Sequence, residues 1–200
     1  MPHYVSLGSL PHKRHTQFRK PDGTLYSEEV IGAEGFSGIS SIAYHVHPPT
    51  VVDEVKDPIP FGPEYVDLDF LRHRHVRGAQ IPSRGAWLEA RQYVMGNADV
   101  RLALCSPTEP MKYFYRNAVA DEMVYIHDGE GVLESPFGNV PFKKGDYVHV
   151  PRTITHRWSF TGGNARVLII ESFSEIRFPK RYQNSSGQLL EHSPYCERDI

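Results

Sequence analysis

The amino-acid sequence predicts an all-β protein, a jelly roll of two packed sheets, and two observations indicate this. Sixteen glycines and sixteen prolines recur at short intervals over 200 residues, which favours turns and short strands over long helices. Short apolar runs that alternate with turn residues fill residues 86–173, a spacing typical of sandwiches and barrels. Hydrophobic residues make up 40% of the chain, which is enough for a buried core.

Residues 1–85 are expected to form an N-terminal arm, strands and a surface loop that pack on the barrel. Pro21-Asp22-Gly23 is a turn sequence, because proline and glycine preset the backbone angles that a turn requires. A candidate strand follows over residues 24–31. A second strand is expected over residues 38–47, where apolar side chains recur.

Two further segments are expected to lie outside the barrel. Residues 48–82 are rich in proline and charge, and they predict a long ordered loop in which Leu68–Arg77 has room for one short helix. Residues 174–200 are polar and predict a C-terminal arm. Because this arm ends without a clear terminus signal, we expect it to lead to a second domain.

Residues 86–173 are expected to form the β-barrel itself. Val100, Leu102 and Leu104 recur at every second position, which is the period of a strand with one buried face. Turn sequences at residues 127–131 and 136–139 separate further apolar runs. The expected strands are residues 87–94, 100–105, 123–126, 132–135, 140–142, 147–151, 156–160 and 165–173.

Charge and composition exclude several classes of function. The formal net charge is -2 and the basic residues are scattered, so no nucleic-acid partner is expected. No apolar run approaches the roughly 20 residues that span a bilayer, and the N-terminus lacks the pattern of a signal peptide. Cys105 and Cys196 are expected to be reduced thiols. The sequence therefore predicts a soluble, cytoplasmic protein without a membrane partner.

Two blocks of residues carry a specific spacing. The first contains Glu122, Gly129 and Gly131, and the second contains Gly145, Pro151 and His156. Together they resemble the paired motifs of the cupin superfamily, whose fold is a double-stranded β-helix, or jelly roll. In that superfamily two histidines and a glutamate of the first block and one histidine of the second bind Fe, Mn, Ni or Zn, ions that imidazole and carboxylate suit.

The match to this ligand set is partial. Glu122 and His156 stand at two ligand positions and are the metal-binding candidates, as a vestigial pair. The two leading histidines are replaced by Tyr115 and Asn117, or by Arg116 and Ala118 under a spacing one residue shorter. Two protein ligands are fewer than the three of a facial triad. The alternative is a metal-free barrel in which Glu122 and His156 form hydrogen bonds, with Arg116 as an ion partner.

Other residues offer weaker candidates for binding. The pairs His45/His47 and His73/His75 could each present two rings on one side of a strand, although surface pairs of this kind are common. Four aromatic residues are candidates for the wall of a pocket: Phe114, Tyr125, Tyr147 and Trp158. Cys105 lies in an apolar strand, where a thiol is normally inert packing.

A second resemblance is more specific than the cupin spacing. The runs at residues 13–23, 34–38 and 44–49, together with 121–131 and 188–200, resemble the N-terminal half of homogentisate 1,2-dioxygenase-like bicupins. The resemblance implies a family that opens the ring of homogentisate with non-haem Fe(II) and O2 in tyrosine and phenylalanine breakdown. It places the iron ligands in the second cupin domain, so no catalytic or cofactor-binding residue is expected within residues 1–200.

Three interpretations follow. The leading one is the N-terminal half of such an oxidoreductase, acting as a scaffold and inactive alone; its partners would be a second cupin domain, a small aromatic substrate and further copies in a homo-oligomer. The second is a stand-alone, metal-free cupin that binds a small ligand. The third is a mononuclear metalloenzyme that uses Glu122, His156 and a third ligand, such as His149 or one of the His45/His47 pair.

Overall fold

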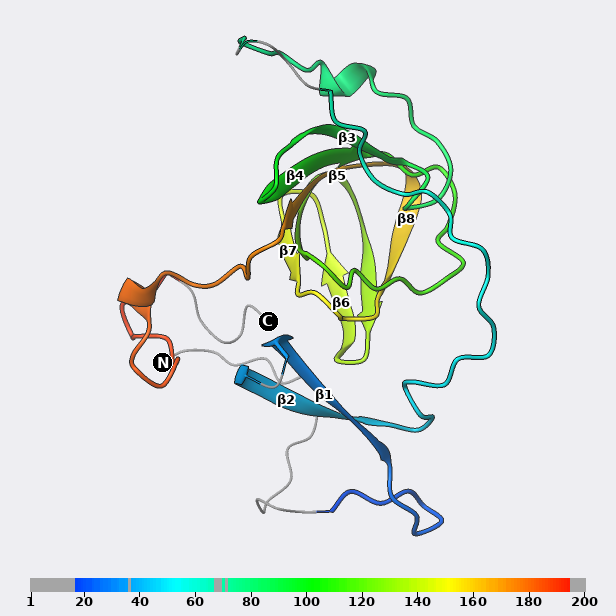
Figure 1. Ribbon diagram of the computed structural model, residues 1–200, viewed down its shortest axis with the longest axis vertical. Coiled ribbons are helices and arrows are strands. Elements are labelled where there is room, and N and C mark those ends of the chain that lie inside the picture. Colours follow the sequence, from blue (N-terminus) through cyan, green and yellow to red (C-terminus); the bar gives the residue numbers. More distant parts are fainter. Residues whose placement is uncertain (1–16, 36, 67–69, 71, 195–200) are drawn as a thin grey trace. The chain divides into compact units, whose positions relative to one another are not determined.

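The computed structural model describes residues 17–35, 37–66, 70 and 72–194, and its regular structure is almost entirely β-strand (Figure 1). The described residues contain two short 3-10 turns and no α-helix, so no helix among them could span a bilayer. The strands are β1 (Ser27–Glu34), β2 (Ser37–His45), β3 (Arg91–Gly96), β4 (Val100–Cys105), β5 (Asp121–Ser135), β6 (Gly138–Phe142), β7 (Tyr147–Val150) and β8 (Arg157–Ser172). The all-β prediction is confirmed.

The chain divides into two compact units. The larger unit, Ser27–Glu175, contains the strands listed above. The smaller unit consists of the two terminal segments, of which residues 17–26 and 176–194 are described. The predicted turn at Pro21-Asp22-Gly23 lies in the first of these segments, where the backbone N–H of Gly23 donates to the Lys20 carbonyl at 2.9 Å.

Six strands of the larger unit form one sheet that rolls on itself. Their order is β3-β4-β8-β5-β6, and β7 pairs with β5 off this path. The long strands β5 and β8 run antiparallel, and a shift of register between Ile126 and Glu130 divides the pair in two. On one side of the shift lie β7 and β4, and on the other lies β6 (Figure 1). This arrangement is the predicted cupin-type jelly roll.

Alternation along the long strands builds the core inside the roll. The inward apolar positions of β5 and β8 are almost completely buried: Val124, Ile126, Val167 and Ile169. Trp87 and Trp158 stack against each other with ring centroids 4.8 Å apart. These two rings contribute the largest buried apolar side chains of the domain.

The structure corrects two predicted interruptions of the long strands. The sequence predicts separate strands over residues 156–160 and 165–173, but both belong to the single strand β8. The turn predicted at residues 127–131 lies inside β5. The two strands stay paired on both sides of the predicted turns, with Asp128 opposite Arg166 and Glu130 opposite Thr161.

Two other predicted elements differ from the structure. The strand predicted from Trp87 begins at Arg91, because the preceding residues form a turn in which Ala90 N–H donates to the Ala86 carbonyl at 2.8 Å. Of the helix considered over residues 68–77, positions 68, 69 and 71 lie outside the described residues, and the remaining positions are not helical.

The first two strands form a hairpin of their own. β1 and β2 pair antiparallel, with Ser27 opposite His45, within a few residues of the two strands that the sequence predicts. Between β2 and β3 the described residues carry only one regular element, the 3-10 turn η1 (Gly78–Gln80). This agrees with the long proline-rich loop expected there.

The position of Gly131 between β8 and β6 leaves no space for a side chain, so a substitution there is expected to destabilise the roll. An added Cβ would overlap the backbone oxygen of Ser159 and lie 2.9 Å from the Phe142 ring. We expect Gly131→Ala to lower the free energy of unfolding by about 2 kcal/mol, measured in urea. Gly163→Ala is the control, since its Cβ would meet nothing within 4 Å. Equal stability of the two variants would contradict the close approach of β8 to Gly131 of β5.

Candidate functional site

Two carboxylates face each other inside the roll. Glu122 of β5 lies directly opposite Glu171 of β8 in the antiparallel register. Glu122 shares the inward side of its strand with the buried Val124, and Glu122 and Glu171 are only 0% and 3% exposed. Like charges opposite each other on paired strands repel, and burial strengthens that repulsion. The pair therefore requires a compensating cation.

Arg91 supplies this cation from the first position of β3. One guanidinium nitrogen, Nη1, donates to Glu122 Oε1 at 2.8 Å and to Glu171 Oε1 at 2.6 Å. The Tyr93 hydroxyl, two residues along the same strand, donates to Glu171 at 3.0 Å. The guanidinium carbon also lies 5.5 Å from the centre of the Trp87 ring, a distance typical of a cation–π contact. We call Arg91, Glu122 and Glu171 the charged triad.

The two carboxylates differ in their protonation. Burial alone would raise the pKa of Glu122, but Arg91 and the side-chain amide of Asn117 hold it below its usual range. Burial raises the pKa of Glu171, and the contact with Arg91 offsets this only in part. Burial opposes the charge of Arg91, yet the adjacent carboxylates raise its pKa. One cation shared by two acids thus keeps Glu122 ionised and makes Glu171 the easier one to protonate.

Asn117 lies beside the charged triad and connects it to the backbone through hydrogen bonds. Its side-chain N–H donates to Glu122 Oε1 at 3.0 Å, and its side-chain oxygen accepts from the backbone N–H groups of Val119 and Ala120. Its carbonyl accepts from Thr153 N–H at 2.7 Å. Thr153 has a φ of 71°, in the left-handed region that favours glycine.

His156 lies within the same buried layer. Its Nδ1 lies 2.9 Å from the Ile154 carbonyl, which assigns the ring proton to Nδ1. Burial lowers the pKa of His156, so the ring is neutral near pH 7. Its Nε2 lies 4.0 Å from Glu122 Oε2. Both atoms are acceptors in this state, and neither has a hydrogen-bond partner among the described residues.

These residues do not fit a protein-held Fe(II) ion. Glu122 and His156 are brought together as the motif predicts, but no group of three His, Cys, Asp or Glu suitable for a metal occurs among the described residues. A facial triad needs three such ligands. In addition, the guanidinium of Arg91 lies 2.8 Å from Glu122 and already neutralises the carboxylate that a metal ion would need.

The structure places the other charged candidates elsewhere. Arg116, the expected ion partner of the pair, instead contacts Glu29 of β1 at 3.4 Å, and Arg91 takes its place beside Glu122. His149 lies 3.4 Å from Asp121 on the other side of β5. His45 contacts Glu29 at 2.9 Å, whereas the remaining three histidines of the two pairs are exposed: His47, His73 and His75.

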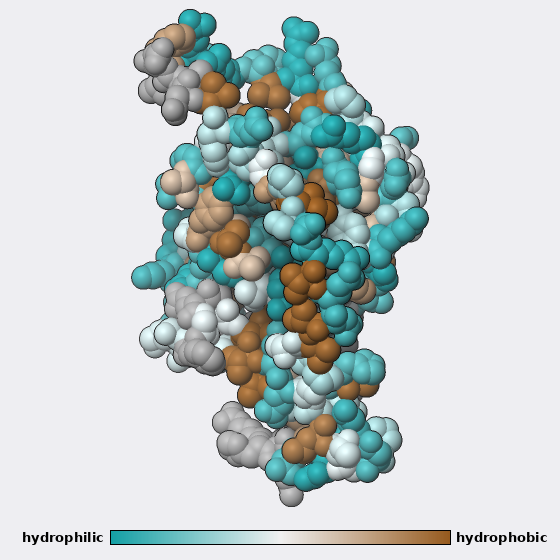
Figure 2. All heavy atoms as spheres, turned by 45° about the vertical axis from the view of Figure 1, so that its right-hand side comes forward, coloured by the Kyte–Doolittle hydropathy of each residue, from teal (hydrophilic) through white to brown (hydrophobic). Residues whose placement is uncertain are grey.

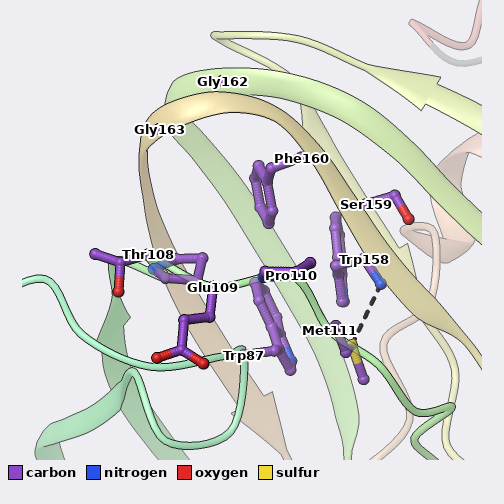
Figure 3. A pocket seen from close by; sticks show the side chains of 11 residues that line it. Trp87, Thr108, Glu109, Pro110, Met111, Trp158, Ser159, Phe160, Gly162 and Gly163 are labelled. Carbon is purple, nitrogen blue, oxygen red and sulfur yellow. Dashed lines mark hydrogen bonds between the residues drawn. The ribbon is translucent and has the colours of Figure 1, made fainter.

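A pocket of about 340 Å³ opens beside Trp158, one of the four aromatic candidates (Figure 3). The other three candidates lie outside its lining. Phe114 is 53% exposed and packs under Arg157, with the guanidinium carbon 4.6 Å from its centre. Tyr125 and Tyr147 contact each other, 4.7 Å apart, on the outer side of the sheet formed by β5 and β7.

Sequence reasoning missed Arg91 and Glu171. Arg91 stands at the start of a strand that was expected to begin at Trp87, and Glu171 follows the apolar run Val167–Ile170. A single charged residue at the end of an apolar strand is a weak signal. Only the register between β5 and β8 shows that Glu171 faces Glu122.

Comparisons with known proteins identify a relative in sequence but no matching family. No protein-family model matches the chain. A protein of Saccharolobus solfataricus named "Putative dioxygenase SSO1533" is 38% identical over 200 residues, which cover 98% of this chain. The chain spans 51% of that relative's length.

Solved structures with a similar β fold include two bacterial proteins. A cupin-2 domain-containing protein of Shewanella frigidimarina is 16% identical, with a TM-score of 0.37, over 41% of this chain and 78% of that one. KdgF of a Halomonas species is 15% identical, with a TM-score of 0.38, over 42% and 78%. The chain is thus similar in sequence to a protein named as a dioxygenase.

Removing the cation of the charged triad is expected to lower the stability of the protein strongly. Arg91→Met keeps an unbranched, flexible side chain but removes the guanidinium and leaves two buried carboxylates opposite each other, so we expect a loss of about 3–5 kcal/mol in the free energy of unfolding. Arg157→Met is the control, because Arg157 and Glu134 form a solvent-accessible pair. Urea denaturation at neutral pH measures both. A loss in Arg91→Met no larger than in the control would contradict the role of Arg91.

Because His156 is buried in its neutral form, the stability of the protein is expected to depend on pH. Since burial lowers its folded-state pKa below 6.5, the unfolded chain binds the proton more readily. The contribution of neutral His156 to the free energy of unfolding is complete at pH values above its unfolded-state pKa. This contribution is lost as the pH falls toward its folded-state pKa. We expect the melting temperature of the protein to fall between about pH 7 and about pH 5, and to fall less in His156→Gln. Parallel curves for the two proteins would show that another group is responsible.

Proposed function

We propose that this chain is the non-catalytic N-terminal cupin half of a ring-cleaving dioxygenase of the homogentisate type. Its barrel would act as a scaffold, and the iron and the ring-opening chemistry would lie outside residues 1–200. The observation that carries the proposal is the charged triad, because Arg91 occupies the carboxylates inside the roll that would otherwise attract a metal ion.

The electrostatics of the interior support this division of labour. A divalent cation at Glu122 and His156 would approach the guanidinium of Arg91, which is itself buried and fully charged. Two positive groups in a low-dielectric interior repel strongly. The layer is therefore suited to hold three strands in place, and it is poorly suited to bind and release a metal, oxygen or a substrate.

The length of the relative supports a second domain. The match covers nearly all of this chain but only 51% of the Saccharolobus protein. A bicupin of the proposed kind has room for one further jelly roll in the remainder. In the whole protein, that second cupin domain would supply Fe(II) ligands and the site for a small aromatic substrate, and further copies would complete a homo-oligomer.

Exposed apolar side chains support a partner surface. On the segment that follows β2, Val52 is 72% exposed, Val55 and Ile59 are each 86% exposed, and Val66 is 78% exposed. Figure 2 shows hydrophobic side chains at the surface of the molecule. Several large apolar groups close together on a segment without regular structure are typical of a surface that another domain or subunit covers.

The proposal predicts that the purified 200-residue chain holds little iron and consumes no oxygen with homogentisate. The measurements are elemental analysis after incubation with Fe(II) and removal of excess metal, and oxygen uptake under the same conditions. One tightly bound iron per chain with turnover would overturn the scaffold role. Glu122→Ala and His156→Ala would then decide the site, since loss of iron in both would assign it to this pair.

A further inference from the structure

The pocket beside Trp158 is separate from the charged triad and has a different chemical character. Its volume, about 340 Å³, lies at the lower end of the range for small-molecule sites and suits a ligand with a single ring. Figure 3 shows its lining, which includes three aromatic rings and the carboxylate of Glu109 beside Trp87. The lining residues are Trp87, Pro107, Thr108, Glu109, Pro110, Met111, Trp158, Ser159, Phe160, Gly162 and Gly163.

Three aromatic rings form one wall of the pocket. Trp158 and Phe160 stand two residues apart on β8, and their planes are within 17° of each other. Trp87 stacks on Trp158 at 4.8 Å, with an angle of 19° between the planes. Both tryptophans are 1% exposed, so they form a fixed backing, while Phe160 is only partly buried and has ring surface left to contact a ligand.

The charge of the pocket comes from Glu109. It is the only ionisable side chain among the lining residues, it is exposed, and no hydrogen bond or ion pair with another described residue occupies its carboxylate. Figure 3 shows the carboxylate on the same side of the pocket as Thr108, close to Trp87. The face of an aromatic ring carries partial negative charge, so the rings and the carboxylate together favour a cation. The same arrangement disfavours an aromatic acid.

We propose that this pocket binds a small aromatic amine, with the ligand ring against Phe160 and its ammonium group toward Glu109. Gly162 and Gly163 leave the opposite rim open, because neither would bring an added Cβ within 4 Å of another atom. The proposal does not depend on the scaffold role, since it concerns neither a metal nor the charged triad. It also separates this pocket from a site for homogentisate, which is an anion.

Tryptophan fluorescence tests the proposal directly. The chain has two tryptophans, Trp87 and Trp158, and both line the pocket, so a bound ring changes the emission of the whole protein. Phenethylamine and the phenylacetate anion are matched probes that differ mainly in charge. We expect saturable binding of the amine, about tenfold tighter than that of the acid. Equal affinities, or no saturation with either probe, would overturn the proposal.

Two variants locate the binding. Glu109→Gln removes the charge from an exposed position and is expected to weaken the amine by about fivefold, while Glu130→Gln, an exposed glutamate outside the lining, leaves it unchanged. Gly163→Leu places a side chain over the open rim and is expected to abolish binding of both probes. Unchanged amine affinity in Glu109→Gln would overturn the role of this carboxylate. Full binding by a folded Gly163→Leu would place the ligand elsewhere.

Discussion

The structure depends on one buried contact, in which the guanidinium of Arg91 lies between the carboxylates of Glu122 and Glu171. These residues belong to β3, β5 and β8, and β4 separates β3 from β8 in the sheet. The contact therefore ties a strand near the edge of the sheet to its two central strands across the interior of the roll. Because all three groups are buried, each is stable there only in the presence of the others.

The same contact explains how the carboxylate of Glu122 can be stable in the interior without a metal ion. A protein interior that contains two carboxylates needs positive charge, and either a metal ion or a guanidinium can supply it. The guanidinium is covalently attached to the chain and, unlike a metal ion, is not taken up from solution. Its fixed length and shape leave Nε and Nη2 of Arg91 without partners among the described residues. The nearby rings of Trp87 and Tyr115, at 5.5 and 5.7 Å, partly compensate for these donors.

The interior of the roll thus has two chemically distinct parts joined by an aromatic residue. Trp87 contacts Arg91 on the side of the charged triad and lines the pocket with Trp158 and Phe160. The charged layer is buried, and its three charged groups contact one another. The pocket is open, combines aromatic and polar lining groups, and carries one carboxylate without a hydrogen-bond or ion-pair partner among the described residues, which favours a ligand. The proposed scaffold and the proposed ligand site can therefore coexist in one domain.

The sequence by itself determined the class of the fold, and it predicted an incomplete set of metal ligands. Glycines and prolines at short intervals, with the alternation from Val100 to Leu104, predict short strands regardless of how those strands pair. The absence of histidine at Tyr115 and Asn117 is likewise a property of residue identity. Only the tertiary structure decided that β8 continues through its glycines, that Arg91 rather than Arg116 meets Glu122, and that Glu171 completes the triad. Strand register and side-chain reach join residues 31 and 80 positions apart, and no local pattern encodes such distances.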